Sequence, residues 1–117
     1  MLRRLSAREQ DRYAHVPALD RARARIVVVP AWLPGIDATT LGRLVVVKRG
    51  REEDRVLVAH ELVHVRQWRE LGVLGFLRAY LGEYLAGRRA GLGHRDAYAR
   101  ISLEREARAL ASENTTS

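Results

Sequence analysis

The residues His-Glu-Leu-Val-His at positions 60–64 lie within an apolar run that spans residues 55–65. Residues four apart on an α-helix share a face and lie about 6 Å apart, so the imidazoles of His60 and His64 can bind one metal ion. Glu61 lies about 100° further around the helix, where its carboxylate can take a proton from a water molecule on the metal. The spacing therefore predicts a helix that carries two metal ligands and a general base.

The flanking sequence supports a helix around these residues. The acidic residues 52–54 suit a helix N-terminus, and Gly72 suits its end. One stripe of this helix is expected to place the histidines toward the interior, and it contains Leu57, His60, His64, Gln67, Trp68 and Leu71. Two buried imidazoles beside a carboxylate are costly without a compensating partner, which favours a metal site over two core histidines. The pattern H-E-x-x-H is typical of zinc metallopeptidases.

Length and composition limit the alternatives. A chain of 117 residues is expected to form one domain, residues 1–117, around a single core. It has no cysteine, so histidine and carboxylate side chains must hold any metal. The basic N-terminus is not followed by an apolar signal region, and no stretch is apolar enough to span a bilayer. A soluble, cytoplasmic protein without a transmembrane segment is therefore the expectation.

The net charge of +7 leaves a second partner class open. Lysine and arginine account for 21 residues, and Lys48 is the single lysine. The arginines are spread along the chain between apolar or small residues, which predicts a solvated basic surface. A basic surface can also attract nucleic acid, anionic lipid or acidic proteins, and binding of nucleic acid is the alternative that remains open.

The remaining sequence predicts an α+β domain. A helix at residues 5–14 is expected to begin at Ser6 with Glu9 completing a capping box, and residues 1–24 are expected to form a helical cover. The expected strands are residues 25–30, 44–48 and, along an edge, 36–41, with a turn at residues 31–35. After the motif helix come a connecting helix at 73–87, a loop at 88–93, a last helix at 101–111 and a flexible tail at 112–117.

A catalytic zinc site needs a third protein ligand from outside the motif helix. The residue types that can supply it downstream are Glu83, His94, Asp96, Glu104 and Glu106. Periodicity does not separate Glu104 from Glu106, since both lie equally far from the centre of the apolar face of the last helix. Ala107, one turn after Glu104, leaves room for a close approach to the motif helix.

The motif at residues 60–64, together with Leu-Glu-Arg-Glu-Ala at residues 103–107, resembles the gluzincin metallopeptidases. The resemblance covers about residues 44–111. It implies a small zincin-like fold, in which a two- to three-stranded sheet packs on the motif helix and a C-terminal "glutamate helix" supplies the third ligand. It also implies one zinc ion per chain, held by His60, His64 and Glu104, with Glu106 or Glu83 as the alternatives. Many members have an aspartate where this chain has Arg108, which leaves the partner of the ligand histidines unassigned.

The resemblance implies hydrolysis of peptide or protein substrates, with Glu61 as the general base. Tyr98 or His94, just before the last helix, are candidates for stabilising the oxyanion, and a surface or packing role is the alternative for each. The substrate is expected to lie extended beside an edge strand. Two other functions remain open: a structural, latent or regulatory metal-binding domain, and an arginine-rich protein that binds nucleic acid.

Overall fold

The computed structural model describes residues 2–30 and 34–116 and shows an α+β protein. The elements in chain order are β1 (Arg3–Arg4), α1 (Ala7–Arg12), α2 (Ala18–Arg23), β2 (Arg25–Val29), β3 (Ala38–Leu41), β4 (Leu44–Lys48), α3 (Arg55–Arg89), α4 (His94–Ala99) and α5 (Ser102–Thr116). Of the expected turn at 31–35, residues 31–33 lie outside the described part. None of the described helices combines the length and apolar character needed to cross a membrane.

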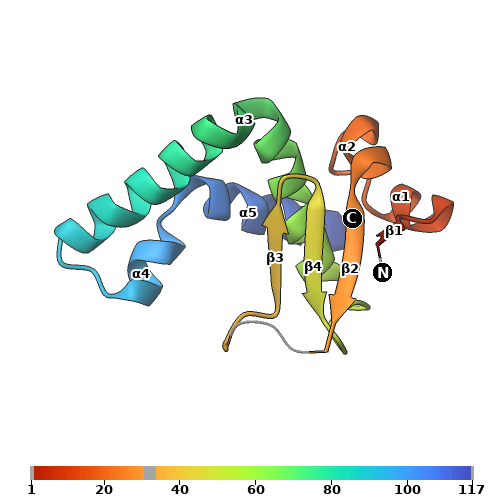
Figure 1. The fold of residues 1–117 in the computed structure, drawn as a ribbon, viewed down its shortest axis with the longest axis horizontal. Helices are drawn as coiled ribbons and strands as arrows, with labels where there is room; N and C mark the ends of the chain where they lie inside the picture. Colours follow the sequence, from red (N-terminus) through yellow and green to blue (C-terminus); the bar gives the residue numbers. More distant parts are fainter. Residues whose placement is uncertain (1, 31–33, 117) are drawn as a thin grey trace.

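The sheet has four strands in the order β1-β2-β4-β3 (Figure 1). The β-branched runs form β2 and β4, which pair in parallel, and β3 pairs antiparallel with β4 across a turn at residues 42–43. The sequence predicts two to three strands, whereas the sheet has four, because Arg3–Arg4 adds a two-residue strand antiparallel to β2. β3 therefore forms one edge of the sheet.

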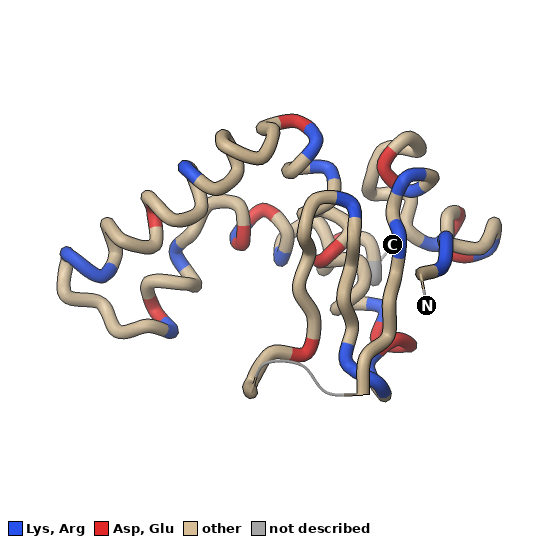
Figure 2. The backbone as a smooth tube through the Cα atoms, in the orientation of Figure 1, with Lys and Arg blue, Asp and Glu red and all other residues tan. Residues whose placement is uncertain are grey.

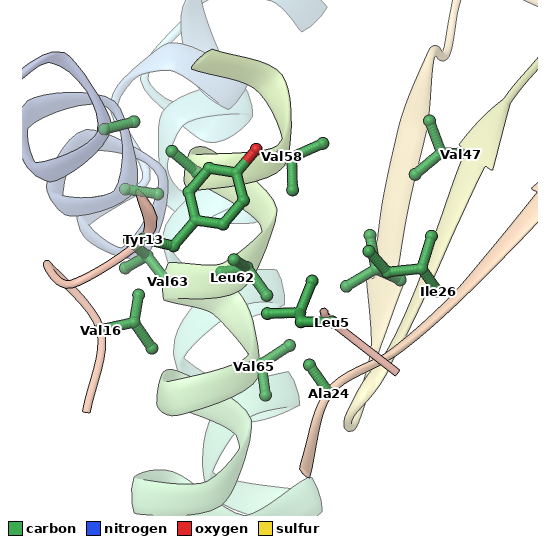
Figure 3. Packing of buried hydrophobic residues seen from close by; sticks show 14 residues of the cluster. Leu5, Tyr13, Val16, Ala24, Ile26, Val47, Val58, Leu62, Val63 and Val65 are labelled. Atoms are coloured by element: carbon green, nitrogen blue, oxygen red, sulfur yellow. The ribbon is translucent and has the colours of Figure 1, made fainter. Parts of the chain in front are cut away.

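The first part of α3 packs across one face of this sheet (Figure 1). Val58, Leu62 and Val65 of α3 belong to the same buried cluster as Ile26 and Val47 of the sheet (Figure 3). Each fully buried aliphatic side chain of this kind contributes about 1.5–3 kcal/mol of transfer free energy. The sheet and its hydrophobic core thus hold the motif helix in place.

The stripe that was expected to face the interior is only partly buried. His64 and Gln67 are buried, but Leu71 is 43% exposed. The deepest apolar residues of the helix, such as Leu62, lie instead on the side that meets the sheet. The histidines are turned away from that side, toward α5.

Gly72 divides α3 into two helical segments. Its φ of 72° and ψ of 170° are not helical, so the first segment ends where the sequence predicts. The helix resumes at once, and the second segment runs away from the sheet toward α4 (Figure 1). We call this second segment with α4, residues 73–99, the arm.

The terminal segments close around the motif helix. The capping box of Ser6 and Glu9 is confirmed at the start of α1. α5 extends to Thr116, through most of the segment for which the sequence predicts a flexible tail, and the Asn114 side chain donates a hydrogen bond to the Arg12 carbonyl group. Contacts between α3 and α5 bring the glutamates of α5 next to the motif.

Candidate metal centre

Three side-chain atoms meet where α5 crosses the first segment of α3. Nε2 of His60 lies 2.8 Å from Oε1 of Glu104, and Nε2 of His64 lies 3.2 Å from the same oxygen. The two nitrogens are 3.2 Å apart. His64 and Glu104 are buried, with 4% and 2% of their surfaces exposed. The structure therefore brings the two histidines together with Glu104.

These separations fit a metal ion. Four-coordinate zinc with bonds of about 2.0–2.1 Å holds its ligand atoms about 3.3 Å apart at the tetrahedral angle. Glu61 is part of the same group, because ligand atoms of His60, Glu61 and His64 lie within 4.8 Å of one another. Oε1 of Glu104 lies within 3.2 Å of both histidine nitrogens, so Glu104 could also contribute a ligand atom. His60, Glu61 and His64 thus form a group that could hold a metal ion, and Glu104 lies against its two histidines.

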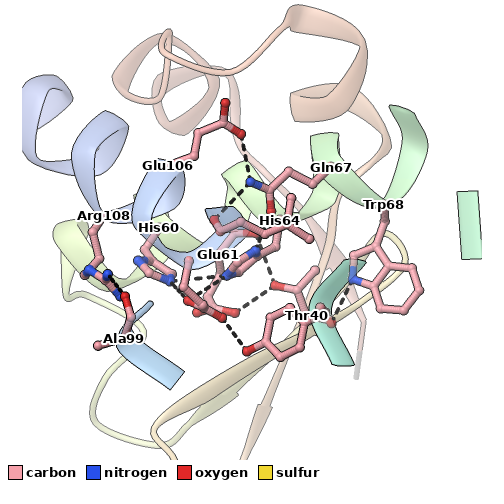
Figure 4. Close-up of polar contacts among 12 residues, drawn as sticks. Thr40, His60, Glu61, His64, Gln67, Trp68, Ala99, Glu106 and Arg108 are labelled. Carbon is pink, nitrogen blue, oxygen red and sulfur yellow. Dashed lines mark hydrogen bonds and ion pairs between the residues drawn. The ribbon is translucent and has the colours of Figure 1, made fainter. Parts of the chain in front are cut away.

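The Gln67 side chain fixes which nitrogen of His64 faces this centre (Figure 4). The Gln67 amide nitrogen donates to the Leu103 carbonyl group at 3.0 Å and to Glu106 at 2.8 Å. Its oxygen must therefore be the atom that lies 2.7 Å from Nδ1 of His64, so Nδ1 carries the proton. Nε2 is thus the nitrogen that faces the centre, 3.2 Å from Oε1 of Glu104. With Nδ1 engaged by Gln67, Nε2 is the nitrogen that could bind a metal ion beside Glu104.

Glu104 carries the negative charge of this centre. Burial alone would raise the pKa of Glu104, but hydrogen bonds from His60, His64 and Tyr80 hold that pKa far below its usual range. The Tyr80 hydroxyl donates to Oε2 of Glu104 at 2.5 Å, and burial with the neighbouring carboxylate raises the pKa of Tyr80. Glu104 is thus an ionised carboxylate whose Oε2 is held by a neutral phenol, while Oε1 faces the histidines.

Glu61 is buried and oriented by the edge strand. The Thr40 hydroxyl of β3 donates to Oε1 of Glu61 at 2.8 Å. Trp68 of α3 donates from its indole nitrogen to the Thr40 carbonyl oxygen at 3.1 Å, which ties β3 to the helix (Figure 4). Thr40 thereby holds the Glu61 carboxylate beside the histidines.

A cleft of about 1060 Å³ opens on the centre. β3 and the residues before it line one wall, including Ile36 and Leu41, and the arm lines the other, including Leu77 and Leu81. His60, Glu61, His64 and Glu104 line it as well. A ligand in the cleft can therefore reach the side chains of the centre.

The other glutamates considered for the third ligand have different partners. Both oxygens of Glu83 accept hydrogen bonds from Ser102, one from its backbone N–H and one from its hydroxyl, at the start of α5. Glu106 accepts from Arg66 and Gln67. Arg108 donates to the Ala99 carbonyl oxygen at 2.6 Å, and Gln67 rather than residue 108 contacts a ligand histidine.

The two oxyanion candidates both line the cleft. Burial, followed by the charge of Glu104, raises the pKa of Tyr98, so its hydroxyl keeps its proton and can donate. Nδ1 of His94 lies 2.8 Å from the Tyr84 hydroxyl on the exposed side of the arm. Of the two residues, Tyr98 lies close enough to Glu104 for that carboxylate to affect its pKa.

Sequence reasoning missed Thr40 and Tyr80 and left Gln67 without a role. Gln67 follows His64 by three residues, a spacing that places two side chains next to each other on a helix, so this contact could have been found. Thr40 and Tyr80 reach the centre through the packing of the edge strand and of the arm. No local pattern indicates either contact.

A family model described as the eCIS core domain matches residues 33–72, about a third of the chain. The matched segment includes β3, β4 and the first segment of α3 with the motif. It ends before Tyr80 and Glu104. No curated protein and no solved structure matches the chain.

Proposed function

We propose that the chain is a small zinc-dependent metallopeptidase with a gluzincin-type, zincin-like arrangement. The observation that carries the proposal is the convergence of His60, His64 and Glu104 within 3.2 Å, with Glu61 beside them in an open cleft. The hydrogen bond between Nδ1 of His64 and Gln67 leaves Nε2 facing Glu104, which supports His64 as a metal ligand. A purely structural site has little need for Glu61 or for a cleft.

In this proposal zinc is held by His60, His64 and Glu104, and when bound it supplies a Lewis acid and an acidified water. Glu61 accepts a proton from the attacking water and passes it to the leaving amine. The hydrogen bond from Thr40 to Oε1 holds the Glu61 carboxylate in position for this proton transfer. The Tyr98 hydroxyl donates to the oxygen of the scissile carbonyl group as negative charge develops there.

The edge strand supports a peptide substrate. The Lys48 N–H donates to the Asp37 carbonyl oxygen at 2.8 Å, which fixes the antiparallel alternation between β3 and β4. By that alternation the backbone groups of Ala38 and Thr40 point away from β4, toward the cleft side. The Thr40 carbonyl oxygen is taken by Trp68. The backbone of Ala38 is then placed to pair with an extended peptide.

The test is zinc content and peptide hydrolysis of the purified protein and four variants. His60→Ala and Glu104→Ala should lose zinc, while Glu83→Ala, a glutamate that caps α5, should retain it. Glu61→Gln should keep zinc and lose hydrolysis by at least about 100-fold, the usual contribution of a general base.

Three outcomes would change the proposal. A wild-type protein that takes up no zinc, even when zinc is added back, would contradict the metal site. Equal hydrolysis by Glu61→Gln would remove the general-base role. Bound zinc without hydrolysis of any peptide in a broad library would favour a structural or latent metal-binding domain.

A further inference from the structure

The outer face of the arm carries a row of exposed aliphatic side chains. We call Val73, Leu74, Leu77, Leu81 and Leu85 the leucine ridge. Leu74 is 83% exposed and Val73 62%, and the other three are between 39% and 52% exposed. The leucines recur every three or four residues, so they form one continuous stripe along the second segment of α3. Adjacent exposed apolar residues of this kind mark an interaction surface.

The opposite face of the same helix is already occupied. Phe76 is 6% exposed and stacks on Trp68 with ring centroids 4.0 Å apart. A side chain at Gly87 would meet Ala97 of α4 at 3.1 Å, so the two helices touch there. Glu83 binds Ser102 of α5. The ridge therefore lies off the packed face of the helix, with Leu77 and Leu81 at the border of the cleft.

The charge around the ridge is positive. Arg78, Arg88 and Arg89 are exposed on the same helical segment. On α4, Arg95 is exposed beside the exposed Asp96. Figure 2 shows where basic and acidic positions lie along the backbone. Glu83 is the one acidic residue of the second segment, and at 100° per residue it lies on the opposite face from Leu81. The ridge thus combines aliphatic side chains with flanking guanidinium groups and fits an anionic, apolar partner.

Two occupants fit this surface poorly. A second copy of the chain would bring Arg78 and Arg88 close to the same residues of its partner, and like charges repel. A specific protein partner is usually bound through aromatic anchors, whereas leucine and valine are under-represented among such anchors. The ridge itself has no aromatic residue.

We propose that the leucine ridge docks on an anionic lipid surface. The arm would lie in the plane of the interface with its leucines among the acyl chains and Arg78, Arg88 and Arg89 on the lipid phosphates. Leu77 and Leu81 also line the cleft, so docking brings the mouth of the cleft to the membrane surface. The proposal rests on the arm alone and does not depend on the metal centre.

The test is co-sedimentation of the protein with vesicles, either of phosphatidylcholine alone or of phosphatidylcholine and phosphatidylglycerol in equal amounts. The wild type should bind only the anionic vesicles. Leu74→Ser with Leu85→Ser should lower the partition coefficient by at least about tenfold, because two side chains lose their transfer into the interface. The matched control is Leu2→Ser with Leu19→Ser, two exposed leucines on the other side of the molecule, which should bind as the wild type does.

The second comparison separates docking from general attraction by net charge. Two double variants remove the same charge from exposed positions. The first pair is Arg78→Gln with Arg88→Gln, and the second pair is Arg8→Gln with Arg105→Gln. The first pair should weaken binding by about tenfold more than the second, because charges next to an anionic surface contribute the most. The proposal would be overturned if both arginine pairs weakened vesicle binding equally, or if both leucine variants lost it equally. It would also be overturned if the wild type did not bind anionic vesicles.

Discussion

The side-chain oxygen of Gln67 lies 2.7 Å from Nδ1 of His64, one turn earlier on the same helix. The amide of Gln67 is held in turn by the Leu103 carbonyl group and by Glu106. This chain of contacts keeps a proton on Nδ1 of His64 and aims its Nε2 at Glu104. A hydrogen bond behind a ligand histidine usually orients the ring and raises its basicity.

Gln67→Leu is therefore expected to weaken zinc binding by about 10- to 100-fold, because the Nδ1–H group of His64 loses its acceptor. Competition with a chromogenic chelator would measure the dissociation constant. Gln10→Leu is the matched control, since that amide contacts the Leu5 carbonyl group, away from the centre. The nitrogen chemical shifts of the His64 ring should also change in Gln67→Leu. Unchanged affinity and shifts would show that Gln67 only packs.

The Thr40 hydroxyl orients Glu61 without touching the three proposed ligands. Thr40→Val keeps the shape of the side chain and removes the donor to Oε1, so peptide hydrolysis should fall by about 10- to 100-fold as the carboxylate loses its position. Zinc affinity should stay at the wild-type value. Thr40→Ser keeps the hydroxyl donor and is the control, so its hydrolysis should stay near the wild-type rate. Loss of zinc in Thr40→Val would contradict a role limited to Glu61.

Local patterns in the sequence predict one part of this structure well. The capping box of Ser6 and Glu9 and the break at Gly72 depend on neighbouring residues and on backbone conformation, and both are found. The spacing of His60 and His64 also fixes their geometry once the helix forms. Features that depend on strand pairing or on contacts between distant segments cannot be predicted from local patterns. Arg3–Arg4 has no apolar signal and becomes a strand only through its register with β2.

Long-range packing decides the rest of the centre. Tyr80 reaches Glu104 because the arm turns at Gly72 and α5 returns beneath it, and no sequence spacing encodes that approach. Periodicity left Glu104 and Glu106 equivalent, since both lie near the border of the apolar face of α5. In the structure the two glutamates have different contacts: Glu104 faces the histidines, and Glu106 accepts a hydrogen bond from Gln67.

The backbone conformation of Gly72 predicts that a side chain at this position destabilises the protein. Its φ of 72° and ψ of 170° belong to a region open essentially to glycine alone, so Gly72→Ala should lower the free energy of unfolding by about 1–3 kcal/mol. A side chain there would meet no atom within 4 Å, so the cost is conformational and not steric. Chemical denaturation would measure it.

Gly82→Ala is the control for this change. Gly82 lies inside the second segment, and a side chain there also meets no atom within 4 Å. Alanine is the better helix former by about 1 kcal/mol, so this variant should be more stable than the wild type. Destabilisation by both substitutions to the same extent would contradict the assignment of the kink to Gly72.

Asp54 begins the motif helix and makes its stability depend on pH. Its carboxylate accepts hydrogen bonds from the Leu57 N–H at 3.0 Å and from Arg51 at 2.6 Å. The Leu57 N–H and then Arg51 lower the pKa of Asp54. Because the folded pKa is below the unfolded one, this stabilisation is present above the unfolded pKa, about 3.9, and is lost as pH falls through the folded value.

Asp54→Ala should therefore lower the free energy of unfolding by about 1 kcal/mol near neutral pH, the usual value of an N-cap. The difference from the wild type should shrink below about pH 4, where the wild-type carboxylate also becomes protonated. Asp54→Asn keeps a neutral cap, so its advantage over Asp54→Ala should not change with pH. Urea denaturation of the three proteins across this range measures both differences, and the other carboxylates cancel because all three share them. A constant gap between the wild type and Asp54→Ala would mean that the charge of Asp54 does not stabilise the helix that carries the metal ligands.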